Sequence, residues 1–251
     1  MATNRTLLFN RQEIKYMIDR TTRTALARDL AAFMRPDAHA GGENGYLVRS
    51  LYFDTAEYMA YHEKLAGMAV RHKLRIRAYG EDPSQSPVVR FEVKSRYLSF
   101  IKKITVDVPS TDYGEVEFAL KRRILPPARL LNDTSVSKEF FRLQRQYNME
   151  PKVIVQYRRQ AFERRETSRV RVSFDDELVA TRHLELLSPL RGARRLLRPG
   201  HCIFEIKLDD VMPYWIHMLI SKYDLQNRAI SKYCYAVRSE ARFSAVGRSE
   251  E

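Results

Sequence analysis

Three short motifs in this chain place a glutamate and a lysine two residues apart around one apolar residue. They are Glu13-Ile14-Lys15, Glu92-Val93-Lys94 and Glu205-Ile206-Lys207. Each lies in a stretch whose apolar residues alternate as in a β-strand. The glutamate and the lysine therefore share one face of the strand, and the apolar residue points to the other. Strands that carry charge on one face cannot bury that face in the core of an ordinary sandwich, so the motifs restrict the fold.

Two further stretches repeat this spacing with arginine alone, Arg75-Ile76-Arg77 and Arg169-Val170-Arg171. Like charges two residues apart on a strand stand only about 7 Å from each other. Several such strands side by side are unfavourable unless a polyanion or a metal ion lies between them. Carboxylate oxygens bind divalent metal ions and cationic side chains bind phosphate. The pattern therefore predicts a phosphate-binding surface.

The overall charge agrees with an anionic ligand. The 251 residues hold 44 Lys+Arg against 31 Asp+Glu, a net charge of +13, which favours nucleic acid, an acidic membrane surface or phosphorylated small molecules. Two cysteines are too few for a disulfide framework, and the histidines lack zinc-ligand spacing. The N-terminus lacks the apolar run of a signal peptide, and no stretch approaches the roughly 20 apolar residues that span a bilayer. We expect a soluble cytoplasmic protein.

The pattern along the chain predicts strands separated by helices. Asp19 is a candidate N-cap for a helix that ends before Pro36, and Pro213 can begin another that ends at Tyr223. The segment 57–65 is a short helix or turn, and 112–147 is a helical insertion. We expect one domain over residues 1–243 and a flexible tail over 244–251. The expected strands cover 9–18, 46–54, 70–79, 88–94, 98–108, 152–164, 169–175 and 201–209.

Two arrangements accommodate strands with one charged face. One is an open sheet whose charged face lies in solvent, and the other is a closed antiparallel β-barrel with a charged interior and helices on its apolar outside. We favour the barrel, an α+β fold, because glutamates recur among the cations at matching positions. That mixture suits phosphate binding bridged by a metal ion.

Five runs of sequence resemble those of the VTC domain, in the family's order. This is the catalytic polyphosphate polymerase domain of the vacuolar transporter chaperone complex, with bacterial relatives. It lies within the triphosphate tunnel metalloenzyme (CYTH-like) superfamily, and this chain resembles a bacterial member. The resemblance covers nearly the whole chain. The runs are Arg49–Thr55, Leu74–Gly80, Phe91–Lys94, Arg171–Asp175 and Phe204–Leu208.

The resemblance implies a tunnel of antiparallel strands that holds a triphosphate or a growing polyphosphate, with a divalent metal ion, Mn²⁺ or Mg²⁺. The chain departs from the family pattern at Arg11, where the superfamily has a first glutamate, and at Ala229, where the family has a basic residue, although Arg228 is adjacent. Glu205 matches the metal ligand, whereas Glu13 and Glu92 either join it or pair with cations. The expected catalytic residues are Lys15, Arg75, Arg77, Lys94, Arg158 and Glu205, and the expected further phosphate-binding residues are Lys103, Arg171, Lys207 and Lys232.

Phosphoryl transfer needs in-line geometry, charge neutralisation and a metal ion more than covalent help from the protein. We expect ATP to enter with its triphosphate in the tunnel and to transfer to phosphate or to a polyphosphate end. With water as acceptor the protein would be a triphosphatase or polyphosphatase. A non-enzymatic polyanion-binding or nucleic-acid-binding module is the alternative from another class, although no RNA-binding motif supports specific nucleic-acid recognition. A membrane protein as partner is compatible with the resemblance, and the sequence leaves the oligomeric state open.

Overall fold

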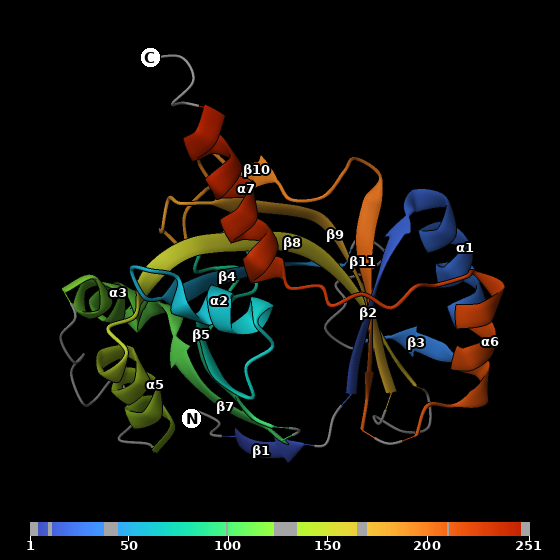
Figure 1. The fold of residues 1–251 in the computed structure, drawn as a ribbon, viewed down its shortest axis with the longest axis horizontal. Coiled ribbons are helices and arrows are strands. Elements are labelled where there is room, and N and C mark those ends of the chain that lie inside the picture. Colours follow the sequence, from blue (N-terminus) through green and yellow to red (C-terminus); the bar gives the residue numbers. More distant parts are fainter. Residues whose placement is uncertain are drawn as a thin grey trace.

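A long antiparallel sheet forms the frame of the molecule in the computed structural model, which describes residues 5–9, 12–37, 45–98, 100–122, 135–164, 170–209 and 211–246 (Figure 1). The expected α+β class is confirmed. The strands are β1 Arg5–Phe9, β2 Gln12–Asp19, β3 Met34–Pro36, β4 Tyr46–Asp54, β5 Val70–Ala78, β6 Val88–Tyr97, β7 Phe100–Pro109, β8 Glu150–Arg164, β9 Val170–Thr181, β10 Arg194–Arg195 and β11 His201–Leu208.

The sheet curves round on itself but is not closed by hydrogen bonds. Its strand order is β1-β7-β6-β5-β4-β8-β9-β11-β2, with β3 added to β8 and β10 added to β9. Because every pairing is antiparallel, the two edge strands β1 and β2 run in the same sense, as two halves of one strand would. The expected single strand over 9–18 is thus an N-terminal run that changes partner, from β7 to β11. The expectation of a closed barrel is corrected accordingly: no β1–β2 ladder occurs among the described residues.

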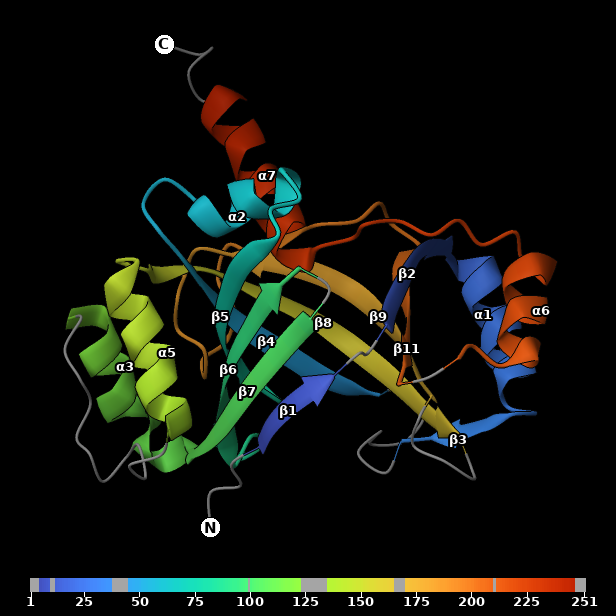
Figure 2. The same cartoon turned by 60° about the horizontal axis from the view of Figure 1, so that its bottom comes forward.

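Helices α1, α3, α5 and α6 lie on the outer face of the sheet, whereas α7 packs on the inner face against Val155 and Tyr157 of β8 (Figures 1 and 2). Asp19 caps the first helix as expected, since its side chain accepts a hydrogen bond of 2.8 Å from the Thr22 amide. Helices α3 and α5 fall within the expected insertion at 112–147, and the 3-10 turn Ser110–Asp112 leads into it, although residues 123–134 lie outside the described part. The helices are α1 Arg20–Leu30, α2 Met59–Leu65, α3 Tyr113–Arg122, α5 Ser135–Gln146, α6 Tyr214–Lys222 and α7 Lys232–Val246.

The apolar spacers of the charged motifs build the core between sheet and helices. Ile76 and Val93 are fully buried in one cluster with Phe140 and Phe141 of α5. Ile206 is buried in a second cluster with residues of α1 and α6. Alternation therefore sends the spacer outward into an apolar layer and turns the flanking charges inward. The expected helical cover of the apolar face is confirmed.

Helix α7 was not expected from the sequence. It begins at Lys232 and runs to Val246, three residues into the segment expected to be a flexible tail, whereas residues 247–251 lie outside the described part. Among the described helices, none has the length and apolar character needed to cross a membrane.

Candidate functional site

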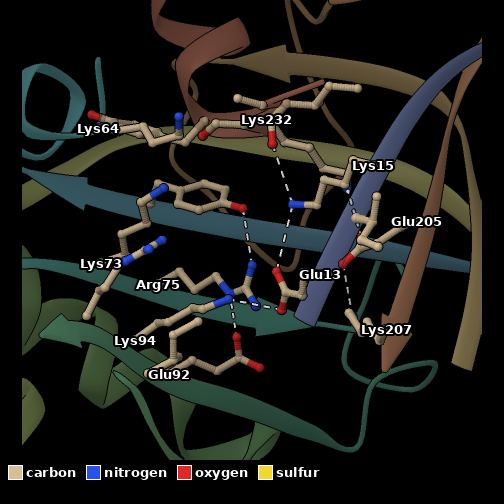
Figure 3. A pocket seen from close by; sticks show the side chains of 18 of the residues that line it. Glu13, Lys15, Lys64, Lys73, Arg75, Glu92, Lys94, Glu205, Lys207 and Lys232 are labelled. Atoms are coloured by element: carbon tan, nitrogen blue, oxygen red, sulfur yellow. Dashed lines mark hydrogen bonds and ion pairs between the residues drawn. The ribbon is translucent and has the colours of Figure 1, made fainter. Parts of the chain in front are cut away.

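A cavity of about 620 Å³ lies inside the curve of the sheet, and we call it the basic cavity (Figure 3). Side chains from β2, β5, β6, β8 and β11 line it, together with residues at the start of α7. Twelve of the lining residues are cations and three are glutamates, which is an unusual excess of one sign in a confined space. The cations are Lys15, Lys64, Arg71, Lys73, Arg75, Arg77, Lys94, Arg96, Arg159, Lys207, Arg228 and Lys232, and the acids are Glu13, Glu92 and Glu205.

Glu92 on β6 is the counter-ion for one wall of the cavity. Its carboxylate is ion-paired with Arg75, with Arg77 at 3.6 Å and with Lys103 at 3.0 Å, and its side chain is buried. Burial alone would raise the pKa of the Glu92 carboxyl, but the charges of Arg75, Arg77 and Lys103 outweigh it and hold this pKa well below its usual value. Glu92 therefore stays ionised and fixes these cations in place.

Glu205 on β11 serves the opposite wall. Its carboxylate oxygens lie 3.2 Å from Lys207 Nζ, 3.3 Å from Arg159 Nη2 and 3.8 Å from Lys232 Nζ. Asp175 on β9 shares two of these cations, because Arg159 donates to both of its oxygens at 2.6 and 2.7 Å and Lys232 lies 2.5 Å away. The two buried carboxylates thus hold three cations in a fixed array.

The position of Lys232 in the cavity also depends on a hydrogen bond made by its neighbour Tyr233. The hydroxyl of Tyr233, the next residue, donates to Asp54 Oδ2 at 2.5 Å, and Asp54 also accepts from the Ala60 amide of α2 at 2.8 Å. Asp54 therefore joins the end of β4, helix α2 and the first turn of α7. Lys232 and Arg159 also lie over the Tyr157 ring, 4.8 and 5.2 Å from its centroid.

Glu13 on β2 reaches across the gap to β6, where its Oε1 lies 3.0 Å from Lys94 Nζ. These strands are far apart in the strand order, so the contact demonstrates how strongly the sheet curves. Burial would raise the pKa of the Glu13 carboxyl, but Lys94 and other cations lower it to about 2. Glu13 also lies 3.9 Å from Lys15, its partner in the first motif.

One end of the basic cavity has cations without carboxylates, and we call it the acid-free end. Lys64 of α2, Arg71 and Lys73 of β5 and Arg96 of β6 line it; none of them forms an ion pair with the three lining glutamates in the described part of the chain, although Glu63 of α2 lies near Arg71. The side chain of Lys73 has no hydrogen bond or ion pair in the described part of the chain, and Figure 3 shows it turned into the cavity beside Lys64. Burial, together with the nearby cations, lowers the pKa of the Lys73 ammonium group to about 8. Unpaired, partly desolvated cations of this kind are suited to an anion.

The chain matches the VTC domain family over residues 10–240. It belongs to that family. The match covers most of the chain, so the resemblance drawn from the sequence motifs is confirmed. No curated protein sequence matches this VTC domain significantly.

Solved structures show likeness in fold. A Bacillus halodurans protein provisionally described as an adenylate cyclase superposes with a TM-score of 0.51 at 12% identity, covering 89% of this chain and 95% of its own. A Vibrio parahaemolyticus protein described in the same way gives a TM-score of 0.47 at 10% identity, with 88% and 94% covered. At 12% identity the first likeness supports the fold alone.

Most of the expected site residues line the basic cavity. Lys15, Arg75, Arg77 and Lys94 do so, as do Lys207, Lys232 and all three glutamates. Lys103 lies beside the cavity through its ion pair with Glu92. Arg171 is opposite Lys207 in the β9–β11 ladder, but it is half-exposed, pairs with the buried Asp37 and does not line the cavity.

Arg158 was expected to be catalytic, but it does not line the cavity. It faces away from the cavity and lies 3.7 Å from the exposed Glu177 of β9. Its neighbour Arg159 points inward with Tyr157, because adjacent residues of a strand face opposite ways. The β8–β9 register also shifts between Gln156 and Arg158. Sequence alternation identified the two faces of β8 but not which one turns inward.

Several cations that line the cavity were not expected as site residues. The sequence contained some evidence for part of them. Lys73 and Arg71 share a strand face with Arg75 and Arg77, which the alternation of β5 makes visible. For Lys64 there was no such evidence, because it comes from a helix, whereas Arg228 was visible only through the family pattern, next to Ala229. The Arg228 amide donates to Lys15 O at 2.9 Å, which lays the segment around Arg228 along β2.

Two of the glutamates fit a divalent metal ion better than the third. Lys15 is opposite Glu205 and Glu13 is opposite Lys207 in the β2–β11 ladder, so the two carboxylates are diagonal neighbours on one wall. Mg²⁺ is commonly held by one or two carboxylates together with substrate phosphates. Glu92 does not fit, since three cations on the other wall already surround it. In the described residues, no group of three His, Cys, Asp or Glu side chains is arranged to hold a metal ion alone.

Phosphate binding is expected to draw protons into the cavity near pH 8. Burial lowers the pKa of both Lys73 and Lys207 to about 8, so each is partly neutral there, and a bound phosphate raises both values. Calorimetric titration with tripolyphosphate, in buffers of different ionisation enthalpy, counts the protons exchanged on binding. Lys73→Met should reduce the uptake. The protons of the ligand itself contribute equally to wild type and variant, so the difference between the two reports the lysine and is expected at pH 8 but not at pH 6. Equal proton uptake by wild type and variant at pH 8 would contradict this expectation.

Proposed function

We propose that this VTC domain synthesises polyphosphate by metal-dependent phosphoryl transfer from ATP to phosphate or to a polyphosphate end. Family membership supports chemistry on phosphates in general. The observation that carries the finer proposal is the division of the basic cavity. One part pairs cations with glutamates, and the acid-free end extends beyond it with cations that form no ion pair with those glutamates.

In this proposal the paired part of the cavity holds the triphosphate. Arg75 and Arg77 hold phosphate oxygens from the β5 wall, and Lys94 does so from β6. Arg159 takes the role expected of Arg158, because it is the arginine of β8 that reaches the cavity. Glu92 fixes Arg75 and Arg77 before substrate arrives, and Asp175 and Glu205 fix Arg159, so charge developing on the transferred group meets cations that need not reorganise.

The remaining lysines complete the site. Lys15, Lys207 and Lys232 lie around Glu205 and neutralise phosphate oxygens on that wall. Glu205 and Glu13 would hold the metal ion, Mn²⁺ or Mg²⁺, which supplies charge neutralisation on the transferring phosphoryl group. Arrival of phosphate at Lys94 would free Glu13 from its ion pair with that lysine.

The acid-free end helps to distinguish a polyphosphate polymerase from a triphosphatase, which use the same phosphoryl-transfer chemistry. A triphosphatase needs to hold only three phosphates and a water molecule, whereas a polymerase must also hold the chain that it extends. Four cations that form no ion pair with the glutamates of the cavity, Lys64, Arg71, Lys73 and Arg96, offer a place for further phosphates of that chain. This favours the polymerase over the triphosphatase.

A nucleic-acid-binding module fits the cavity less well. The three glutamates project among the cations, where they would repel a nucleic-acid backbone unless metal ions intervened. Such binding would persist in chelator and fall steeply with salt. Binding in chelator without any nucleotide turnover would therefore favour this alternative.

The proposal is tested by incubating the purified protein with ATP and Mn²⁺ and resolving the products by phosphorus NMR and gel electrophoresis. Long-chain product is expected, whereas free phosphate alone would assign a triphosphatase and no reaction would contradict catalysis. Lys73→Met should shorten the product more than it slows ATP consumption, because it acts at the acid-free end. Lys222→Met is the matched control, since Lys222 pairs with Asp29 outside the cavity.

A further inference from the structure

A row of exposed apolar side chains lies at the rim of the basic cavity. Val70 of β5 is opposite Tyr97 of β6 in the strand register, and Tyr97 is opposite Phe100 of β7. These three side chains share the outer face of the sheet, and all are exposed, with Phe100 at 70%. Leu98 at the tip of the β6–β7 hairpin is also 70% exposed, and its amide donates to Ala69 O at 2.8 Å.

The row is uncovered because the helical layer ends one row earlier. The preceding row on the same face includes His72 and Ser95, which are buried and hydrogen-bonded to each other at 2.8 Å. Tyr147, just after α5, packs against His72 with ring centroids 5.7 Å apart. Beyond this point the sheet continues without cover. Leu65, the last residue of α2, and Met68, two residues before β5, are exposed as well. A contiguous exposed patch of this kind on a soluble domain marks an interaction site.

The inner face of the same rim is basic. Arg71 and Arg96 are opposite each other in the register, directly beside the Val70 and Tyr97 pair, and both line the cavity with Lys64. Their guanidinium groups turn back toward the rim: Arg71 donates to Met68 O at 2.8 Å and Arg96 donates to Leu98 O at 2.7 Å. One strand edge therefore presents apolar side chains on one face and cations on the other.

We propose that this rim docks on an anionic lipid bilayer. The apolar tip, Leu98 and Phe100 above all, enters the interface, while Lys64, Arg71 and Arg96 face the anionic headgroups. Interfacial binding rises with buried apolar area and with attraction between basic residues and anionic lipid, and this edge supplies both. The mouth at the acid-free end then opens at the membrane surface. The proposal concerns binding alone and does not depend on the reaction catalysed.

The test is sedimentation of the full chain with vesicles of phosphatidylcholine, with and without about one quarter phosphatidylserine. The tip variant combines Leu98→Asn with Phe100→Thr. Asn tolerates the positive φ of 57° at Leu98, and Thr keeps the strand preference at Phe100, so the fold should persist. The matched control combines Tyr214→Gln with Met218→Gln, which removes two exposed apolar side chains from α6 at a distance from the rim (Figure 1).

The wild type and the α6 control should bind the anionic vesicles, and the tip variant should bind at least about tenfold more weakly. Binding should also weaken at high salt. Failure of the wild type to bind, equal binding to neutral vesicles, or equal loss in both variants would overturn the proposal. A wild-type dimer that the tip variant dissociates, without vesicle binding, would assign the rim to self-association instead. Turnover of ATP without lipid should be unchanged in the tip variant, which separates this result from the proposed reaction.

Discussion

Replacing Arg159 by alanine should lower kcat/KM by about 10²- to 10³-fold, the effect of removing a fixed donor to developing charge. Arg159 is also one of the two cations that Asp175 and Glu205 share, so its removal leaves buried carboxylates short of a partner and should cost about 3 kcal/mol or more in the free energy of unfolding. Steady-state kinetics and denaturant unfolding measure the two effects separately.

The control for this variant is the next residue along the chain. Arg158→Ala removes an identical side chain from the same strand, but it faces away from the cavity toward the exposed Glu177. Its kinetics and stability should stay near the wild type, since exposed ion pairs contribute little. Should Arg159→Ala fail to fold, Arg159→Lys keeps the charge while losing the two-pronged contact with Asp175. Similar kinetics in Arg158→Ala and Arg159→Ala would contradict our placement of the site on β8.

Replacing Glu205 by glutamine should raise the Mn²⁺ concentration needed for half-maximal activity by about 100-fold or more, because the substitution removes the carboxylate charge at nearly constant shape. A second effect follows from the pKa of Lys207. Burial lowers that pKa and Glu205 raises it, so the value of about 8 should fall further in the variant. The alkaline limb of activity should then move to lower pH, which a pH–rate profile at saturating metal measures.

Glu92→Gln is the matched control, because Glu92 is the other fully buried glutamate of the basic cavity. Its carboxylate faces Arg75, Arg77 and Lys103 on the opposite wall, where we place no metal ion. We expect Glu92→Gln to lower the stability without raising the Mn²⁺ requirement of the protein that remains folded. Equal shifts in the metal requirement of both variants would place the metal ion differently.

Much of the sheet could be predicted from alternation alone. The strands β4, β5, β6, β7, β8 and β11, and the hairpin between β6 and β7, lie close to their expected ranges. The N-cap at Asp19 and the helix after Pro213 also follow from local chemistry. Helix α7 escaped prediction because its face packs on strands that lie far away in sequence, so its neighbours in the chain gave little signal.

The sequence by itself determined that one face of most strands is charged and the other apolar, because the two-residue period of a strand sorts side chains regardless of their surroundings. It also identified the family through the order of the motifs. The tertiary structure alone decided which face of β8 turns inward, that Glu13 meets Lys94 across the cavity, and that Glu92 and Glu205 serve opposite walls. These contacts join strands distant in sequence, and the curvature of the whole sheet sets them.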